Sequence, residues 1–322
     1  MNTLRNIIFV LFVLTVTLAG CKKDREANQN ESTNSGIQLK NGYLVFKDSV
    51  TFNEHLNWII QNETNPEVIN EFNRKLGFIS FSEVYDKGMR IADPVEFEDY
   101  RSKNPDCFRK IILEDNSEFW EMPMASILSY LTNINGVYQI DETIYRATEE
   151  YLFSTENEDK LPIIIKTSLA INDNLIEKVA GQIVKNLKGQ VSYKTAYFVW
   201  NDRRIVARIY HNDVGSMTYY EARTTSQQKN WSGVWVYAKI PLLLQSSNEG
   251  YYRYVIGGDG SLSDPISIPA SYDPKTDHDN FIRTLLTTNH EVSLWNSSCL
   301  VYHRGERYGS NPTIENNQLF VW

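Results

Sequence analysis

The side chains that most often act as nucleophiles are few in this 322-residue chain, and their spacing keeps them apart. Of three cysteines and five histidines, only Cys299 and His303 lie close in sequence. On a strand they would share a face, yet four residues at about 3.3 Å each would separate them by roughly 13 Å. Local spacing therefore predicts no cysteine–histidine dyad. For Cys107 we expect a small buried hydrophobe, and the alternative is a disulfide to Cys299.

Metal-ligand spacing is also absent. The sequence contains no His-x-x-x-His or Cys-x-x-Cys pattern of the kind that binds zinc. Asp273, Asp277 and Asp279 are close together, and carboxylates suit Ca²⁺, but the EF-hand order and its distal glutamate are missing. We expect a solvated turn there, with an aspartate capping a helix over residues 281–286, and we expect no cofactor.

Aromatic side chains are the most informative feature. Five of seven tryptophans and twelve of nineteen tyrosines follow residue 190. On a strand near residues 234–240, side chains alternate between two faces. One face carries the aliphatic Val234, Val236, Ala238 and Ile240, and the other carries Trp235, Tyr237 and Lys239, with Trp231 in phase before them.

Two interpretations of this pattern remain open. If the aliphatic face is the core, then Trp231, Trp235 and Tyr237 form an exposed strip. Such a strip suits the apolar faces of sugars or the centre of a protein interface. The alternative is that both faces are covered, because β-sandwich cores also use tryptophan and tyrosine.

The amino terminus has the pattern of a lipoprotein signal peptide over residues 1–20. Arg5 provides the positive charge, residues 7–16 are apolar apart from one threonine, and Leu18-Ala19-Gly20 precedes Cys21. The run is shorter than the roughly 20 residues of a transmembrane helix. Leu-Ala-Gly-Cys resembles the bacterial lipobox, and this resemblance implies cleavage before Cys21 and a diacylglycerol on its thiol. Two or more acyl chains give stable anchoring.

Residues 21–41 are predicted to be a disordered tether, because residues 22–36 are polar except for Ala27. The formal net charge is −8, and loss of Arg5 with the signal peptide would leave about −9. The chain thus carries no general basic surface for nucleic acid. We expect an outer-membrane location through the lipid, on either the surface-exposed or the periplasmic face.

Residues 42–165 are predicted to form an α+β domain of helices and hairpins. Thr51 and Glu54 have the spacing of a capping box. Pro66 and Pro94 each follow a residue that can cap a helix, which places proline in the first turn. Asn135-Gly136 favours a type I′ hairpin turn leading into a strand over residues 137–140.

The second half of the chain is predicted to be mostly strands. Apolar residues recur every four positions between residues 171 and 187, which predicts a helical connector over residues 166–189. Residues 190–322 contain short strands separated by turns, which favours a β-sandwich-like all-β domain. The fold class expected is therefore α+β followed by all-β.

Two stretches of the first half resemble the uncharacterised cell-envelope lipoprotein families of gut Bacteroidetes. They are Gly77-Phe78-Ile79-Ser80-Phe81 and Asn135-Gly136-Val137-Tyr138-Gln139-Ile140-Asp141-Glu142-Thr143-Ile144-Tyr145. The resemblance covers about residues 42–152 and implies a fold unit and a compartment, but no activity. Glu142 stands where the families have glycine, which leaves the turn after Ile140 in doubt.

The sequence thus favours a lipid-anchored, non-enzymatic protein that binds a glycan or a surface protein through its C-terminal β domain. One alternative is a hydrolase of glycan or peptidoglycan, because forty acidic residues allow many carboxylate pairs. Another is a structural component of an outer-membrane complex.

Replacing Cys21 tests the anchor directly. We expect the Cys21→Ala protein to be recovered in the soluble fraction, because no thiol remains to carry the acyl chains. Cell fractionation with intact-mass spectrometry checks this. A wild-type protein without an acyl group would contradict the prediction.

Overall fold

The structure is a computed structural model, and it describes the chain from residue 36 onward with gaps. The described ranges are 36–113, 115–124, 126–148, 151–166, 177–180, 192–197, 202–214, 217–246, 251–252, 255–256, 261–262, 266–267, 272–289, 298–306 and 313–321. The predicted signal peptide, Cys21 and the tether as far as residue 35 lie outside these ranges.

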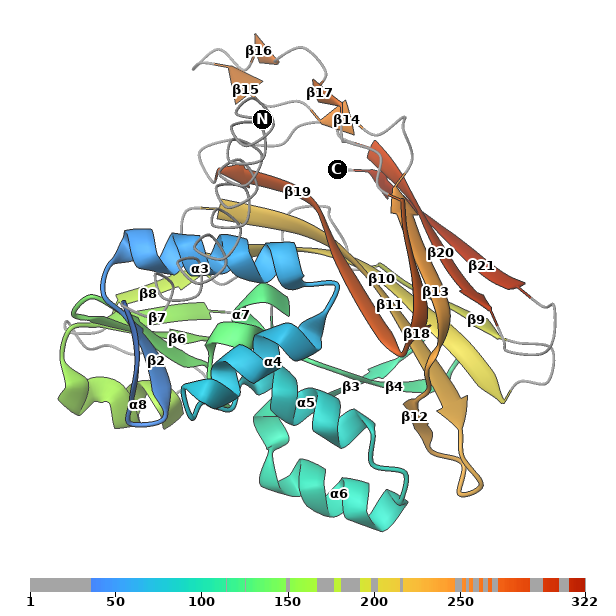
Figure 1. Cartoon of the computed structure of the whole chain (residues 1–322), viewed down its shortest axis with the longest axis horizontal. Coiled ribbons are helices and arrows are strands. Elements are labelled where there is room, and N and C mark those ends of the chain that lie inside the picture. Colours follow the sequence, from blue (N-terminus) through green and yellow to red (C-terminus); the bar gives the residue numbers. More distant parts are fainter. Residues whose placement is uncertain are drawn as a thin grey trace, which may run out of the picture.

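The first half of the chain combines short strands with helices (Figure 1). Its helices are α3 (Ser49–Asn62), α4 (Pro66–Lys75), α5 (Phe81–Met89), α6 (Pro94–Lys103), α7 (Ser126–Leu131) and α8 (Leu161–Lys166). Its strands are β1 (Ile37–Lys40), β2 (Tyr43–Phe46), β3 (Arg109–Ile112), β4 (Glu118–Glu121), β5 (Val137–Ile140), β6 (Thr143–Ala147), β7 (Tyr151–Thr155) and β8 (Glu177–Ala180). One sheet has the order β1-β2-β5-β6-β7-β8, and β3 pairs with β4 separately.

Longer strands make up the described part of the second half. They are β9 (Ser192–Tyr197), β10 (Arg203–Val214), β11 (Met217–Lys229), β12 (Trp235–Tyr237), β13 (Ile240–Ser246), β18 (Tyr272–His278), β19 (Asn280–Asn289), β20 (Ser298–Glu306) and β21 (Thr313–Val321). Four two-residue strands also occur: β14 (Tyr251–Tyr252), β15 (Val255–Ile256), β16 (Ser261–Leu262) and β17 (Ile266–Ser267). The α+β class expected from the sequence is confirmed.

Two sheets of the second half lie against each other, as Figure 1 shows on its right-hand side. One contains β9, β10, β11 and β12, with β19 on β11, and the other contains β18, β13, β20 and β21. Thr224 Oγ1 on β11 lies 2.7 Å from Nδ1 of the buried His303 on β20. This hydrogen bond joins the two facing sheets.

Two helix starts follow the sequence and one departs from it, although Asn65 before Pro66 makes no capping hydrogen bond. Asp93 accepts hydrogen bonds from the backbone N–H of Val95 and Glu96 and begins α6, as expected. The capping box at Thr51 is wrong, because Asp48 accepts from both the backbone N–H and the hydroxyl of Thr51 at 2.8 Å. The Asp48 side chain thus accepts from a free backbone N–H of the first helical turn, and α3 begins at Ser49, before Thr51. Pro66 begins α4 as expected.

Strand pairing corrects two of the predicted segments, the tether over residues 21–41 and the helical connector over residues 166–189. β1 falls inside the stretch predicted to be a tether, and it pairs with β2 from Ile37 to Lys40. β8 falls inside the predicted helical connector, and it pairs with β7 instead. In both cases a neighbouring strand supplies hydrogen bonds that the local sequence pattern does not reveal. The rest of residues 167–191 lies outside the described residues.

Two further local predictions are also wrong. Asn135-Gly136 follows α7 and not a strand, and Asn133 Oδ1 accepts hydrogen bonds from the N–H groups of Asn135 and Val137. The hairpin of this region is β5–β6, and it turns at Asp141, whose φ is 53°. Residues 281–286 are not a helix, because β19 pairs with β11 along most of its length.

The main core lies beneath the helices and includes one residue from the β half. Leu56, Ile59, Phe81 and Leu128 are each at most 2% exposed, and Tyr237 belongs to the same cluster. The two halves of the chain therefore share buried surface.

A comparison of two glycines tests the backbone geometry at the start of β5. Gly136 has a φ of 77°, and a Cβ there would overlap the carbonyl oxygen of Ala147. Gly42 has a φ of 79° with nothing within 4 Å of that position. We expect Gly42→Ala to lower the free energy of unfolding by about 1–2 kcal/mol, and Gly136→Ala by more, since a steric overlap is added. Urea denaturation measures both, and equal losses would contradict this geometry.

Candidate functional site

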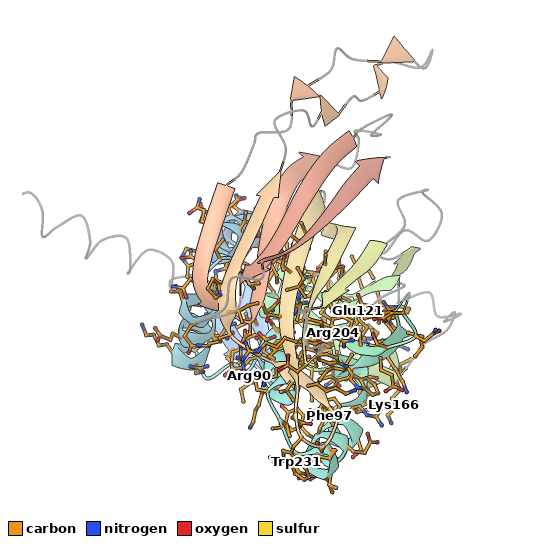
Figure 2. The ribbon with its side chains drawn as sticks, turned by 90° about the vertical axis from the view of Figure 1, so that its right-hand side faces the viewer. Arg90, Phe97, Glu121, Lys166, Arg204 and Trp231 are labelled. Atoms are coloured by element: carbon orange, nitrogen blue, oxygen red, sulfur yellow. The ribbon has the colours of Figure 1, made fainter. Side chains whose placement is uncertain are left out.

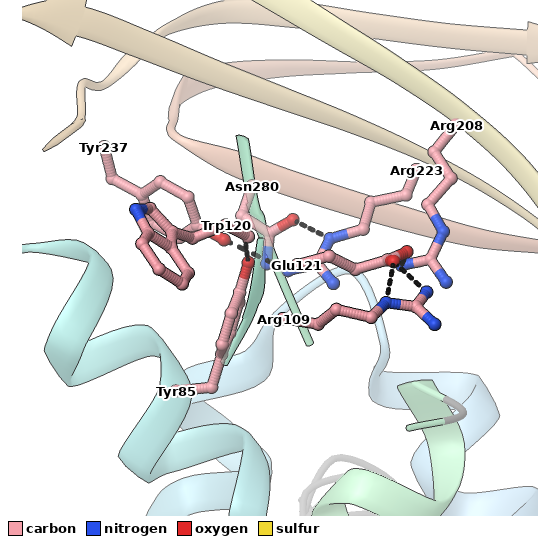
Figure 3. Close-up of polar contacts among 8 residues, drawn as sticks. All are labelled: Tyr85, Arg109, Trp120, Glu121, Arg208, Arg223, Tyr237 and Asn280. Carbon is pink, nitrogen blue, oxygen red and sulfur yellow. Dashed lines mark hydrogen bonds and ion pairs between the residues drawn. The ribbon is translucent and has the colours of Figure 1, made fainter. Parts of the chain in front are cut away.

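A buried ion cluster joins β4 of the first half to the long strands of the second (Figure 3). The carboxylate of Glu121, which is 0% exposed, forms an ion pair with Arg109 on β3. Its other oxygen lies 2.5 Å from Nη1 of Arg208 on β10, which is 4% exposed. A buried charge is tolerated when it is paired and hydrogen-bonded. Glu121 therefore holds β10 against the small β3–β4 sheet.

A second set of contacts extends from α5 to β11 and β12. Tyr85 donates a hydrogen bond to the carbonyl of Trp120 at 2.7 Å. Arg223 donates to Asn280 at 2.7 Å and to the hydroxyl of Tyr237 at 3.1 Å. Burial raises the pKa of Tyr85 to about 12 and that of Tyr237 well above its usual value, so both phenols stay protonated.

Arg204 makes a third link and also supports a tryptophan. Its guanidinium donates to Gln227 at 2.9 Å, to the hydroxyl of Ser117 at 2.7 Å and to the carbonyl of Glu118 at 2.6 Å. The same guanidinium lies 4.2 Å from the ring centroid of Trp235. Cation–π contact fixes the ring, so the residue that joins the two halves also orients Trp235.

The contacts of Arg204 lie in the wall of a groove between the two halves, which we call the seam groove. Its volume is about 440 Å³, and it lies between α6, β4 and the strands β10 to β12. Three aromatic side chains line it, namely Phe97, Trp120 and Trp235. The other lining residues are Pro94, Glu98, Ser117, Glu118, Arg204, Gln227, Lys229, Gly233 and Val234.

One buried polar group at the seam groove lacks a partner among the residues that the structure describes. Gln227 is 1% exposed, and its Oε1 accepts from Arg204, but no described residue accepts a hydrogen bond from its Nε2. A buried donor without an acceptor is unfavourable by about 1–3 kcal/mol. A ligand oxygen in the groove would relieve this penalty.

The three aromatic residues expected to form a strip do not share one exposed face. Trp231 is 91% exposed, Trp235 is half-buried in the seam groove, and Tyr237 is 8% exposed. β12 contains only three residues, and Tyr237 contacts Tyr85 of α5 at a ring-centroid distance of 6.5 Å. The expectation of exposure is therefore wrong for Tyr237, because helix α5 covers it.

Trp231 lies in the turn just before β12, at the lower end of the molecule in Figure 2. Asn230 Oδ1 accepts hydrogen bonds from Ser232 and Val234 and shapes this turn. Asn230 also donates to the carbonyl of Ala92, which fixes the turn to the segment before α6. Gly233 and Val234 of the same turn line the seam groove, so Trp231 stands beside it.

Sequence reasoning missed Phe97, Trp120, Arg204 and Gln227. They come from four separate elements, and no local period connects them. The only sequence signal is the pair of adjacent aromatic residues Phe119 and Trp120, which strands favour. Only the side-chain contacts between β4 and the second half bring the Trp120 ring into the same groove as Trp235.

The other chemical candidates are structural where they are described. Cys107 is buried and free, and burial raises the pKa of its thiol to about 12. His55 is stacked on Trp58, and burial lowers its pKa to about 4. Among the described residues no group of histidine, cysteine and acidic side chains could hold a metal ion. None of the helices described is long and apolar enough to cross a membrane.

Asp86 and Asp279 are two of the four acidic residues that line a pocket between α4 and α5. Burial raises the pKa of Asp86 to about 6, although Arg223 and Arg90 oppose the change. Asp279 lines the same pocket, but both of its oxygens bind Arg90. Asp86 can therefore hold a proton near neutral pH, whereas Asp279 is occupied. Glu67 and Glu83 line the same pocket, and each binds Arg74 through one oxygen. The two-acid hydrolysis considered from the sequence therefore stays an alternative.

Comparisons with known proteins add little. No family model matches the chain, and no curated protein matches it. A solved structure, a DUF4848 family protein from Bacteroides thetaiotaomicron, is similar at 16% identity and a TM-score of 0.28, covering 89% of this chain and 100% of its own. A TM-score this low carries no argument about fold or function.

The pH dependence of stability tests the burial of Asp86. Its pKa is higher in the folded state than the usual 3.8, so ionisation above pH 4 lowers the free energy of unfolding, by at most about 3 kcal/mol. Asp86→Asn removes this loss. We expect the variant to be more stable than wild type at pH 8 and the difference to shrink towards pH 4. Urea denaturation at both values measures it, and a difference independent of pH would contradict the burial.

Proposed function

We propose that this chain is a lipid-anchored cell-envelope protein that binds a glycan in the seam groove without catalysing a reaction. The observation that supports this most is the grouping of Phe97, Trp120 and Trp235 with buried polar side chains in one groove. Aromatic rings stack on the apolar faces of sugars, and adjacent polar groups bind the hydroxyls.

The polar residues of the groove suit hydroxyl groups in particular. Gln227 Nε2 is a donor that needs an acceptor, and Glu118 and Lys229 are exposed and supply charge of both signs. Sugar hydroxyls donate and accept, so they can satisfy all three groups at once. A ligand with a single strong charge would be repelled by whichever of Glu118 and Lys229 has the same sign of charge.

Trp231 extends this proposal beyond the groove itself. A tryptophan that is 91% exposed leaves a large apolar area in water, and this is unfavourable unless a ligand covers it. Its turn also contributes Gly233 and Val234 to the groove wall. A chain of several sugar units could contact Trp235 and Trp231 together.

The anchor remains a proposal that rests on Leu18-Ala19-Gly20-Cys21. Acyl chains on Cys21, followed by a polar segment, would hold the folded part near an outer membrane, where polysaccharides are available. The partner of the groove is then a polysaccharide of the cell's surroundings or of its own envelope.

Tryptophan replacement tests the groove. We expect Trp235→Ala to weaken binding to the best polysaccharide of a panel by about tenfold or more, since one stacked ring contributes about 1–3 kcal/mol. Trp231→Ala should weaken it less, and Trp235→Phe should retain part of the affinity. Affinity electrophoresis with starch, xylan, mannan and peptidoglycan fragments gives the readout.

The matched control is Ile79→Ala, since Ile79 is also exposed, at 61%, and lies outside the groove. It should leave affinity unchanged. If no polysaccharide binds, or if Trp235→Ala and Ile79→Ala behave alike, glycan binding at this groove is wrong.

A further inference from the structure

A second pocket, which we call the α4–α5 pocket, lies on a different face of the shared core. Its volume is about 520 Å³, within the range of small-ligand sites. Helices α4 and α5, which lie next to each other in Figure 1, form one wall. Lys239, Asp279 and Asn280 from the β half form the other.

Helical spacing places the polar side chains of the first wall together. Glu83, Asp86 and Arg90 recur three and four residues apart on α5 and at its end, so they share one face. Asn70 and Arg74 do the same on α4. Arg74 binds Glu83 at 2.8 Å and joins the two helices along this face.

The oxygens on this face lack hydrogen-bond donors. Among the described residues the Asp86 carboxylate accepts no hydrogen bond and forms no ion pair, although the residue is only 9% exposed. Asn70 Oδ1 and Glu83 Oε2 are also buried without a partner. All three unpartnered atoms are acceptors, so the pocket lacks donors and not acceptors.

The nearby guanidinium groups do not donate hydrogen bonds to these three oxygens. Arg74 is held by Glu67 and Glu83, and Arg90 is held by Asp279. Lys87 and Lys239 line the pocket but are exposed to solvent. Arg223 of β11 interacts with Asp86 through its charge, but its hydrogen bonds go to Asn280 and Tyr237.

We propose that the α4–α5 pocket binds a small ligand through a primary ammonium group, which donates to Asp86, Asn70 and Glu83. An ammonium has three N–H donors and no acceptor, so it matches three acceptor oxygens. Its positive charge pairs with the one carboxylate of the pocket that has no ion-pair partner. The charged groups that face Asp86 are Glu83 and Arg90 of α5, Arg223 of β11 and Asp279.

Matched probes test the ammonium requirement by isothermal titration calorimetry at pH 7. Glucosamine is compared with glucose, and alanine amide with propionamide, because each pair differs in the amino group. We expect the amine of at least one pair to bind and its neutral analogue not to. A preference for glucosamine identifies an amino sugar, and a preference for alanine amide identifies an amino acid or peptide amino terminus.

Variants locate the site. We expect Asp86→Asn to weaken binding of the amine about tenfold or more, the range for loss of a charged hydrogen bond. Glu67→Gln is the control, because Glu67 lines the same pocket but is exposed and bound to Arg74. It should change the affinity little. On the wild-type chain, affinity should also fall between pH 7 and pH 5 as Asp86 takes up a proton.

This pocket is independent of the seam groove, so Trp235→Ala should bind the amine as wild type does. The proposal is overturned if neither amine binds or if the neutral analogues bind equally well. It is also overturned if a folded Asp86→Asn protein, shown by its thermal transition, keeps the affinity of wild type.

Discussion

The ion cluster at Glu121 is the interaction on which the rest of the structure depends. A carboxylate that is 0% exposed requires partners, and they come from both halves: Arg109 on β3 and Arg208 on β10. Removing one partner of a buried pair is unfavourable by about 3–5 kcal/mol, because the other charge is left uncompensated. The two halves are therefore held together by a requirement of charge pairing, and apolar contact adds to it.

Both candidate sites follow from this junction. Arg204, which joins β10 to the segment before β4, also supports Trp235 in the seam groove. Arg90 of α5 binds Asp279 of the β half and closes one side of the α4–α5 pocket. Glu63 at the end of α3 accepts two hydrogen bonds from Thr284 and adds a third point of attachment. Neither site would exist if the halves folded as separate domains.

The sequence predicted the parts of this structure that local chemistry controls. Pro66 and Pro94 marked helix starts, and residues 190–322 were predicted to be mostly strands. Trp231, Trp235 and Tyr237 were predicted to form one exposed strip, but Tyr237 is buried. The reason is physical: helix α5 covers Tyr237, and a packing partner some 150 positions away leaves no trace in local periodicity. Strand β8 and the groove residues from four elements were missed for the same reason.

Calorimetry of the Cys21→Ala chain tests most directly whether the two halves form one unit. If the Glu121 cluster joins them as described, unfolding is a single transition whose calorimetric and van't Hoff enthalpies agree. Glu121→Gln should lower the midpoint of that transition, because Arg208 is then left buried without its carboxylate partner. Two separate transitions in the Cys21→Ala chain that keeps Glu121 would contradict the account, because the two halves would then unfold independently.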